Sequence, residues 1–336
     1  MAVRVGINGF GRIGRNFYRA ARDRGADLEI VSVNDLTSPA TLAHLLKYDS
    51  VLGRLGAEVE VTEDGISVDG KEFRVTAERD PKALPWGELS VDVVIESTGL
   101  FTDRDKAAAH IDAGAPRVIV SAPATNADAT FVVGVNDDTF DPEKHKVVSN
   151  ASCTTNCFVP MVKVLDDAFG IQKGMMTTVH AMTNDQNLLD LQHKDLRRGR
   201  SAAINIVPSS TGAARATSLV MESMKGRLDG TALRVPVPDG SITDFTVLLE
   251  KDVTVDEVNE AFKKASSDGR LKDIIQYSTD PIVSTDIIGC PASVVFDSDL
   301  TMAMGNLVKV CGWYDNEWGY SNRLMDLTLL VGGANK

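Results

Sequence analysis

A glycine-rich turn directly after the first strand-like segment constrains the fold of this chain most strongly. Val3 to Ile7 is a short apolar run, and Gly9-Phe10-Gly11-Arg12-Ile13-Gly14 follows it before apolar residues recur at helical spacing. Glycines at these three places permit a tight turn and let backbone N–H groups approach a pyrophosphate at a helix N-terminus. The pattern predicts the first strand, turn and helix of a dinucleotide-binding fold.

The segments after this turn fit the same fold, whereas a GxGxxG turn alone is a weak indication of a nucleotide site. Leu28 to Val33 reads as a second strand, and Asp35 follows it about 20 residues beyond the last glycine. A carboxylate at this place binds ribose hydroxyls and repels a 2′-phosphate. We therefore predict NAD rather than NADP as the cofactor, and reject an incidental glycine turn.

Strand-like and helix-like segments continue to alternate as far as residue 150. Strands are expected at Glu58 to Thr62, Ile66 to Ala77 (with a hairpin turn at Asp69-Gly70), Val91 to Ile95 and Arg117 to Ser121, and a helix at Asp103 to Ala113. The carboxyl ends of parallel strands line the ligand crevice of a doubly wound sheet, so Ser121 is a candidate cofactor contact, although ordinary loop chemistry explains it equally well. We predict a Rossmann-type NAD-binding domain over residues 1–150.

A second distinctive stretch, Ser149 to Cys157, lies where this alternation ends. Cys153 follows the apolar pair Val147-Val148 and precedes helical spacing from Phe158 to Leu165. A cysteine at the start of a helix meets free N–H groups and the positive end of the helix dipole, which favour the thiolate that attacks carbonyls. Taken alone, Cys153 would more often be a small buried hydrophobe. Its small polar neighbours leave room for a substrate and favour a nucleophile.

The β-rich run from Met175 to Thr183 supplies a candidate base. It contains His180, which we predict to take the proton of Cys153. A lone histidine is usually structural, and only its pairing with a candidate nucleophile changes that interpretation. The other four histidines have no comparable setting and are expected to be structural or surface groups.

Two further stretches carry candidate anion ligands. Asn184 to Asn205 is polar, poorly periodic and rich in arginine. It is either a solvated loop or an ordered loop whose arginines face a phosphate or a neighbouring subunit. Pro208 to Ala214 then opens a helix with hydroxyl and N–H groups suited to an oxyanion, although Thr211 also fits the commoner role of an N-cap.

The remainder of the chain predicts a second domain with a mixed or antiparallel sheet. Thr231 to Val237 and Ser241 to Glu250 read as paired antiparallel strands, and Thr254 to Glu257 reads as a capping box. Further strands are expected at Ser293 to Phe296 and Leu307 to Trp313. We predict an α/β protein with an α+β catalytic domain over residues 151–315 and a C-terminal helix, about 316–336, that returns to the first domain.

Composition excludes several classes of protein. The 336 residues suffice for two domains, and the net charge of −12 argues against nucleic-acid coating and against docking on an anionic membrane. Four cysteines in such a long chain make no disulfide framework, and no cysteine–histidine cluster has the spacing of a structural zinc site. There is no signal-peptide layout and no apolar run of transmembrane length. We expect a cytoplasmic protein that binds no metal, nucleic acid or membrane.

Taken together, the motifs resemble those of the phosphorylating glyceraldehyde-3-phosphate dehydrogenases over essentially the whole chain. The resemblance rests on GINGFGRIGR at Gly6 to Arg15, SNASCTTNC at Ser149 to Cys157, TTVHA at Thr177 to Ala181, PSSTGAA at Pro208 to Ala214, RVPVP at Arg234 to Pro238 and WYDNEWGYSNR at Trp313 to Arg323. It implies oxidation of D-glyceraldehyde 3-phosphate with NAD and inorganic phosphate to 1,3-bisphosphoglycerate and NADH, in glycolysis and gluconeogenesis. Cys153 would form a thiohemiacetal and then a thioester, with His180 as the base.

The resemblance also implies binding residues and an assembly. One anion site would use Thr183 and Arg234, with Asp185 close by. The other anion site would use Ser152, Thr154, Arg198, Thr211 and Gly212. Cofactor contacts would be made by the turn glycines Gly9, Gly11 and Gly14, and by Arg12, Ile13, Asp35, Arg79, Ser121 and Asn316. The family is homotetrameric, and the Asn184 to Asn205 stretch matches a loop that reaches toward a neighbouring cofactor site.

Some departures and rival interpretations remain at this stage. Gln192 stands where NAD-preferring members commonly have proline, which weakens the NAD assignment slightly, although the charge of Asp35 outweighs it. A related erythrose-4-phosphate dehydrogenase typically lacks the STGAA turn kept at Ser210 to Ala214. A redox-sensing NAD-binding regulator would need neither His180 aligned with Cys153 nor two clusters of oxyanion ligands. The intact set of Cys153, His180 and Arg234 speaks against a binding or scaffolding protein with vestigial enzyme apparatus.

Overall fold

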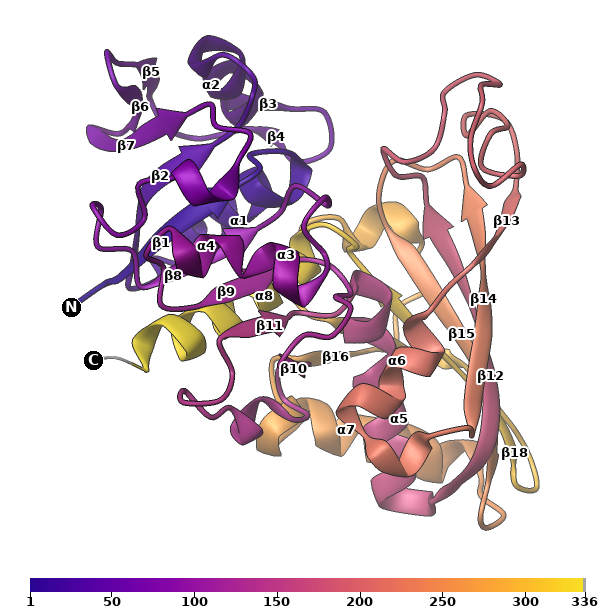
Figure 1. Cartoon of the computed structure of the whole chain (residues 1–336). Coiled ribbons are helices and arrows are strands. Elements are labelled where there is room, and N and C mark those ends of the chain that lie inside the picture. Colours follow the sequence, from indigo (N-terminus) through magenta and orange to yellow (C-terminus); the bar gives the residue numbers. More distant parts are fainter. Residues whose placement is uncertain (335–336) are drawn as a thin grey trace. The chain divides into compact units, whose positions relative to one another are not determined.

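The computed structural model describes residues 1–334, and the chain divides into two compact units. Unit 1 comprises Met1–Phe131, Asp137–Ala151 and the C-terminal segment from Ser321 (Figure 1). Unit 2 comprises Val132–Asn136 and Ser152–Tyr320. The chain therefore completes most of unit 1, builds unit 2, and returns to unit 1 at its end.

Unit 1 is built on a nine-stranded sheet with the order β10-β11-β9-β8-β1-β2-β7-β6-β5. Neighbouring strands from β10 to β7 are parallel, and β6 and β5 extend the sheet antiparallel. The strands are β1 (Val3–Asn8), β2 (Leu28–Asn34), β5 (Val59–Val61), β6 (Gly65–Val68), β7 (Lys71–Thr76), β8 (Val93–Glu96), β9 (Val118–Val120), β10 (Ala129–Thr130) and β11 (Val147–Ser149). Because β1 has β2 on one side and β8 on the other, the strand order reverses at β1, where doubly wound sheets bind ligands.

The helices of unit 1 include the predicted one after the glycine turn and another, at Pro39–Lys47, that was not predicted from the sequence. They are α1 (Arg12–Asp23), α2 (Pro39–Lys47), α3 (Arg104–Ala107), α4 (Ala109–Asp112) and α8 (Trp318–Gly333), with a small hairpin of β3 (Tyr48–Asp49) and β4 (Gly53–Arg54). The single helix predicted over Asp103 to Ala113 is wrong in detail, because it breaks into two short helices at Ala108. The hairpin turn at Asp69-Gly70 is confirmed, since both residues have the positive φ angles that such a turn needs.

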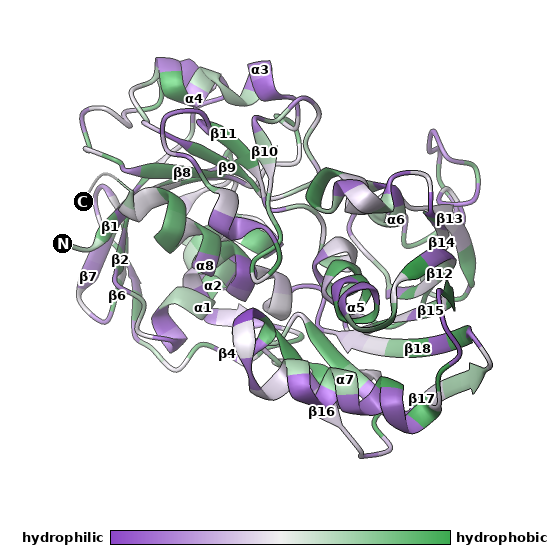
Figure 2. Cartoon of the chain, turned by 90° about the horizontal axis from the view of Figure 1, so that it is seen from below, coloured by the Kyte–Doolittle hydropathy of each residue, from purple (hydrophilic) through white to green (hydrophobic). Residues whose placement is uncertain are grey.

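The C-terminal helix α8 packs within unit 1, as predicted. At Gly332, α8 lies so close to β1 that a Cβ on this residue would be 2.3 Å from the side chain of Val3. Arg24 at the end of α1 forms an ion pair with Asp326 of α8 at 2.9 Å. Residues 335–336, the last two of the predicted C-terminal helix, lie outside the described part of the chain. Figure 2 shows the strands β8 and β9 as largely hydrophobic, in keeping with a buried parallel sheet.

Unit 2 is built on a seven-stranded mixed sheet with the order β13-β14-β12-β15-β18-β17-β16. The strands are β12 (Ile171–Ala181), β13 (Val207–Ser210), β14 (Leu228–Val235), β15 (Ser241–Leu249), β16 (Ile275–Ser278), β17 (Val294–Met304) and β18 (Leu307–Tyr314). The prediction that β14 and β15 pair with each other is wrong, because the long strand β12 lies between them. It pairs with β14 in parallel and with β15 antiparallel.

Helices α5 (Cys153–Phe169), α6 (Ala213–Val220) and α7 (Val255–Ser267) lie on one face of this sheet (Figure 1). Buried phenylalanines join the two layers: Phe158 of α5 meets Phe245 of β15 edge-on, with ring centroids 4.8 Å apart. Aromatic pairs of this geometry add to the free energy of burial. The predicted capping box at the start of α7 is confirmed, with Thr254 and Glu257 each bonding the other's backbone.

Candidate active site

The first residue of helix α5 is Cys153, as the sequence predicts. Ser152 is the N-cap, and its Oγ accepts a hydrogen bond from the backbone N–H of Thr155 at 3.0 Å. Ala151 just before it has φ 55°, in the left-handed region that glycine favours, so the chain enters the helix through a sharp turn. The thiol is therefore held at a rigid helix start rather than on a loose loop.

His180 faces this thiol from near the end of β12. Its Nε2 lies 3.4 Å from the Sγ of Cys153, and its Nδ1 lies 2.7 Å from the carbonyl oxygen of Ala181. That carbonyl can only accept, and it is the nearest partner of Nδ1, so we assign the proton to Nδ1, which leaves the Nε2 lone pair directed at the thiol. Arg234 Nη1 also lies 3.0 Å from Nδ1, but it has the Ala181 carbonyl and the Thr183 hydroxyl as acceptors. Arg234, the neighbour of His180 in the parallel register of β12 and β14, donates to Ala181 O and to the hydroxyl of Thr183.

Burial and charge set the protonation of this pair. Burial, and next the charge of Arg234, lower the pKa of His180 to about 3. Burial raises the pKa of Cys153, and the Arg234 charge opposes that rise. The helix start also acts in favour of thiolate, as the sequence argument held, but burial is the larger influence on the thiol. A neutral imidazole one hydrogen bond from a thiol is suited to take its proton when the sulfur attacks.

Beside the cysteine and histidine, two arginines share one polar network. Arg234 donates to the hydroxyl of Thr183 at 3.1 Å, and that hydroxyl donates to Asp185. Arg198 donates to the other oxygen of Asp185 at 2.6 Å and to Ser209 at 3.3 Å. Burial raises the pKa of Asp185, but the Thr183 bond and the two arginine charges outweigh it and lower the pKa overall. Arg198, which was assigned to the second predicted anion site, is therefore linked through Asp185 to Thr183 and Arg234 of the first predicted anion site.

The other predicted anion ligands are placed less uniformly. Thr154 is buried, and its hydroxyl lies 2.8 Å from the hydroxyl of Tyr314, so that side chain is engaged in the core. Thr211 accepts a hydrogen bond from the N–H of Ala213 at 3.2 Å. It is not the N-cap that its alternative interpretation expected, because Gly212 holds that position at the start of α6. Sequence reasoning missed Tyr314, whose only signal was its place in the WYDNEW run.

The glycine turn in unit 1 is shaped for close approach of backbone to a ligand. Gly9 has φ +92°, and a Cβ there would lie 2.7 Å from the N atom of Thr98. A Cβ on Gly14 would lie 2.4 Å from the carbonyl oxygen of Gly9, so this glycine is needed for helix–strand packing. A Cβ built on Gly11 would have no other atom within 4 Å, so the space beside this residue is open. No side chain caps the N-terminus of α1. These features fit the pyrophosphate of NAD.

Most of the other predicted cofactor residues belong to unit 1. Asp35 follows β2, and its carboxylate accepts from the N–H groups of Phe10 and Thr37, both at 3.0 Å. Ile13 is partly buried on α1, and Arg12 forms an ion pair with Asp49. Arg79 is exposed beyond the end of β7, and Ser121 directly follows β9. Asn316 belongs to unit 2, where it accepts from the hydroxyl of Ser241 at 2.7 Å.

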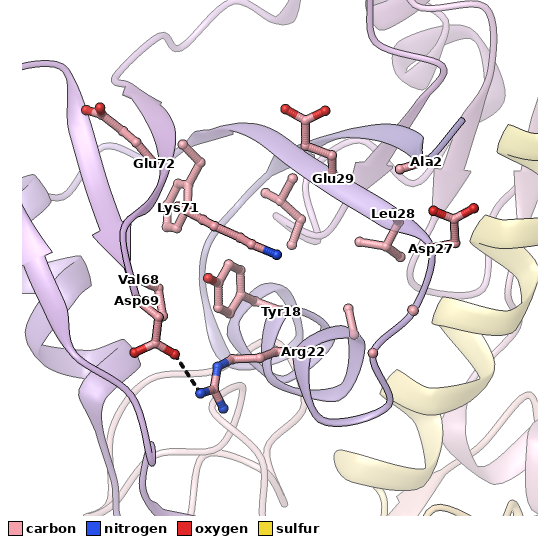
Figure 3. Close-up of a pocket in the computed structure, with 15 residues that line it drawn as sticks. Ala2, Tyr18, Arg22, Asp27, Leu28, Glu29, Val68, Asp69, Lys71 and Glu72 are labelled. Carbon is pink, nitrogen blue, oxygen red and sulfur yellow. Dashed lines mark hydrogen bonds and ion pairs between the residues drawn. The ribbon is translucent and has the colours of Figure 1, made fainter.

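A separate pocket of unit 1 lies at the opposite ends of the strands (Figure 3). It is lined by residues from the starts of β2 and β7 and from the second half of α1, including Tyr18, Arg22 and Lys71. Arg22 is held there by an ion pair with Asp69 at 2.7 Å. Because the glycine turn lies at the carboxyl ends of the strands, this pocket is not the predicted cofactor site.

Two whole-chain features bear on function. All four cysteines are free, and Cys153 is partly buried. In the part of the chain that the structure describes, no helix is both long and apolar enough to cross a membrane.

Comparison with known proteins matches both units. The model of the glyceraldehyde 3-phosphate dehydrogenase NAD binding domain matches residues 3–104, and that of the C-terminal domain matches residues 152–316. The chain is 64% identical over 333 residues to glyceraldehyde-3-phosphate dehydrogenase from Streptomyces coelicolor, with 99% of each chain covered. It is 60% identical over 338 residues to that of Mycobacterium avium, again with 99% of each covered. This chain belongs to the glyceraldehyde-3-phosphate dehydrogenase family.

Proposed function

We propose that this protein oxidises D-glyceraldehyde 3-phosphate with NAD and inorganic phosphate, giving 1,3-bisphosphoglycerate and NADH. The observation that carries the proposal is the 3.4 Å contact between Cys153 Sγ and His180 Nε2, with Arg234 beside them in unit 2. A nucleophile, a base and a cation within one network are the groups that covalent oxidation of a phosphorylated aldehyde requires.

The first step is attack of Cys153 on the aldehyde. A bond forms between Sγ and the carbonyl carbon, the thiol proton passes to His180 Nε2, and the C=O π bond opens to the oxyanion of a thiohemiacetal. NAD, when bound, supplies the acceptor for the hydride that leaves this carbon. Two-electron oxidation leaves a thioester on Cys153. A phosphate oxygen then attacks the thioester carbon and the C–S bond breaks, which gives an acyl phosphate. Cys153 leaves as the thiolate and recovers its proton from His180.

The polar network around Asp185 suits the two anions of this reaction. We assign the substrate phosphate to Arg234 and Thr183, and the attacking phosphate to Arg198 with Ser152, Thr154, Thr211 and Gly212. Guanidinium groups can bind the oxygens of a phosphate in bidentate geometry. Because Arg198 already pairs with Asp185 at 2.6 Å, an incoming phosphate has to share or displace that carboxylate.

The domain roles, assembly and location are part of the same proposal. We assign NAD binding to residues 1–150 with the C-terminal helix, and catalysis to residues 151–315. We propose a homotetramer, supported by large apolar side chains that are 65–86% exposed in and beside the 184–206 loop: Leu188, Leu189, Leu191, Leu196, Ile204 and Ile206. We also propose a cytoplasmic location, in line with the four free cysteines.

The test is NADH formation from glyceraldehyde 3-phosphate, with and without phosphate, with NAD and NADP compared. We expect sustained turnover only with phosphate and a strong preference for NAD. Absence of turnover, or turnover indifferent to phosphate, would contradict the phosphorylating mechanism. Erythrose 4-phosphate serves as the alternative substrate, and a higher kcat/KM for it would reassign the specificity.

A further inference from the structure

A row of buried polar side chains crosses the carboxyl ends of four neighbouring strands in unit 1. The Thr76 hydroxyl on β7 donates to Asn34 Oδ1 on β2 at 2.9 Å, and Asn34 Nδ2 donates to Asn8 Oδ1 on β1 at 2.7 Å. Asn8 Nδ2 in turn donates to Glu96 Oε2 on β8 at 2.6 Å. Asn8, Asn34 and Glu96 are at most 4% exposed, so the two bonds that join them are made away from water.

The same row continues on the far side of Glu96. The indole N–H of Trp86 donates to His110 Nδ1 at 3.0 Å. Since an indole N–H can only donate, His110 carries its single proton on Nε2, which donates to Glu96 Oε2 at 2.9 Å. Trp86 and His110 are both completely buried. The imidazole is therefore neutral, and its tautomer is fixed by two partners.

Both branches of this network end at the Glu96 carboxylate. Oε2 accepts from Asn8 and His110, while Oε1 accepts from the backbone N–H of Thr98 at 2.8 Å and from the Thr98 hydroxyl. Four donors on two oxygens match the acceptor-only chemistry of an ionised carboxylate. A buried charge that loses such partners is expensive, so these bonds hold their elements firmly in place.

Each strand end in the network directly precedes a segment of the cofactor site. Asn8 precedes Gly9 of the glycine turn, and Asn34 precedes Asp35. Glu96 precedes Ser97, whose hydroxyl donates to the Gly9 carbonyl at 2.6 Å. The bonds to Glu96 therefore set the spacing of three loops that must contact one dinucleotide at the same time.

We propose that Glu96 is a positioning residue for NAD, holding the glycine turn, the Asp35 loop and the Thr98 loop in binding geometry. This inference rests on NAD being the cofactor of the proposed function. The neutral isostere in Glu96→Gln would place an NH₂ group against donors of Asn8, His110 or Thr98. A switch of the His110 tautomer would only place its Nδ1–H against the indole N–H of Trp86, so that two donors would face each other there. At least one loop must then move, although no group that touches the substrate has changed.

The experiment measures the Kd for NAD and the steady-state constants of folded Glu96→Gln. We expect the Kd for NAD to rise about tenfold or more, and the Kd for ADP-ribose to rise in parallel, because a lost buried hydrogen bond to a charged group is worth about 1.5–3 kcal/mol. The kcat at saturating NAD should stay within about twofold of wild type. Arg117→Gln is the matched control, since Arg117 is equally buried in unit 1 but donates to Val331 O and Pro142 O. It should lower the Tm and leave the Kd for NAD unchanged.

A milder pair of variants keeps the test decisive if Glu96→Gln does not fold. Thr98→Ser keeps the hydroxyl that donates to Glu96 and accepts from the N–H of Leu100, whereas Thr98→Val removes it. We expect a raised Kd for NAD in Thr98→Val only. An unchanged Kd for NAD in folded Glu96→Gln, or equal values in the two Thr98 variants, would overturn the proposal. If the wild-type protein itself did not bind NAD, the proposed function would fail instead.

Discussion

The Sγ atom of Cys153 lies 3.4 Å from Nε2 of His180, although the two residues are 27 positions apart in the chain. One stands at the first turn of α5 and the other near the end of β12, so two regular elements define the contact. A nucleophile and base on rigid elements keep a reproducible distance, which proton transfer requires. The proposed covalent chemistry therefore depends on the packing of α5 against the sheet of unit 2.

Cys153→Ser should abolish NAD reduction and leave NAD binding intact. A serine hydroxyl is a far weaker nucleophile than a thiol at neutral pH, whereas the glycine turn and Asp35 lie in the other unit. Stopped-flow absorbance measures NAD reduction, and calorimetry measures NAD binding. Cys290→Ser, which changes a cysteine outside the proposed site, should keep full activity. Loss of NAD binding in Cys153→Ser would assign Cys153 a structural role.

His180→Gln should lower kcat by about 10²–10⁴, the usual contribution of a positioned general base. Because acylation would become the slow step, no burst of NADH should precede the steady state in this variant. Affinity for NAD should not change. A kcat within tenfold of wild type would show that another group takes the thiol proton.

Asp35→Asn should weaken the preference for NAD over NADP. The carboxylate at the end of β2 repels a 2′-phosphate, and the amide carries no charge while keeping one oxygen for the N–H of Phe10 or Thr37. We expect the ratio of kcat/KM values for NAD and NADP to fall by about tenfold or more, on the basis of one lost charge interaction of 1–2 kcal/mol. An unchanged ratio would place cofactor discrimination elsewhere, with Gln192 as the next residue to vary.

Stability should fall with rising pH because of one buried acid. Burial, and next the charges of Asp315 and Glu317, raise the pKa of Asp239 from its ordinary value of 3.8 to about 8. Below about pH 4 the group is protonated in both states and carries no penalty. As the pH rises toward 8, the unfolded state alone gains by ionising, so the free energy of unfolding decreases.

Urea unfolding at pH 5 and pH 8 measures this effect. Asp239→Asn should show a smaller decrease in unfolding midpoint between these pH values than the wild type. Asp299→Asn, at an exposed position of unit 2, should behave as the wild type does. A steep decrease retained in Asp239→Asn would exclude Asp239 as its source.

Local sequence chemistry predicted the elements that carry the site. The glycine turn before α1, the hairpin at Asp69-Gly70 and the capping box at Thr254 each depend on residues within a few positions of one another. The placement of Cys153 at a helix start follows from the same kind of signal. Such features can be read from the chain because the interactions that fix them are local.

Non-local pairing could not be read in the same way. The neighbours β14 and β15 in sequence are separated by β12, because strand order depends on which edges the whole sheet leaves open. Strand β17 runs to Met304, well beyond the predicted end at Phe296. It passes through a bulge between Asp297 and Met302, where polar residues interrupt the apolar pattern from which the strand was predicted. The hydrogen bond from Thr154 to Tyr314 spans 160 positions and has no local signal.

The most direct test of the central claim is the mass of the enzyme after mixing with glyceraldehyde 3-phosphate and NAD without phosphate, followed by acid quenching. We predict one 3-phosphoglyceryl group per chain, located on the Cys153 peptide and absent from Cys153→Ser. Adding phosphate before the quench should discharge it. An enzyme that makes NADH but carries no acyl group on Cys153 would contradict the covalent mechanism.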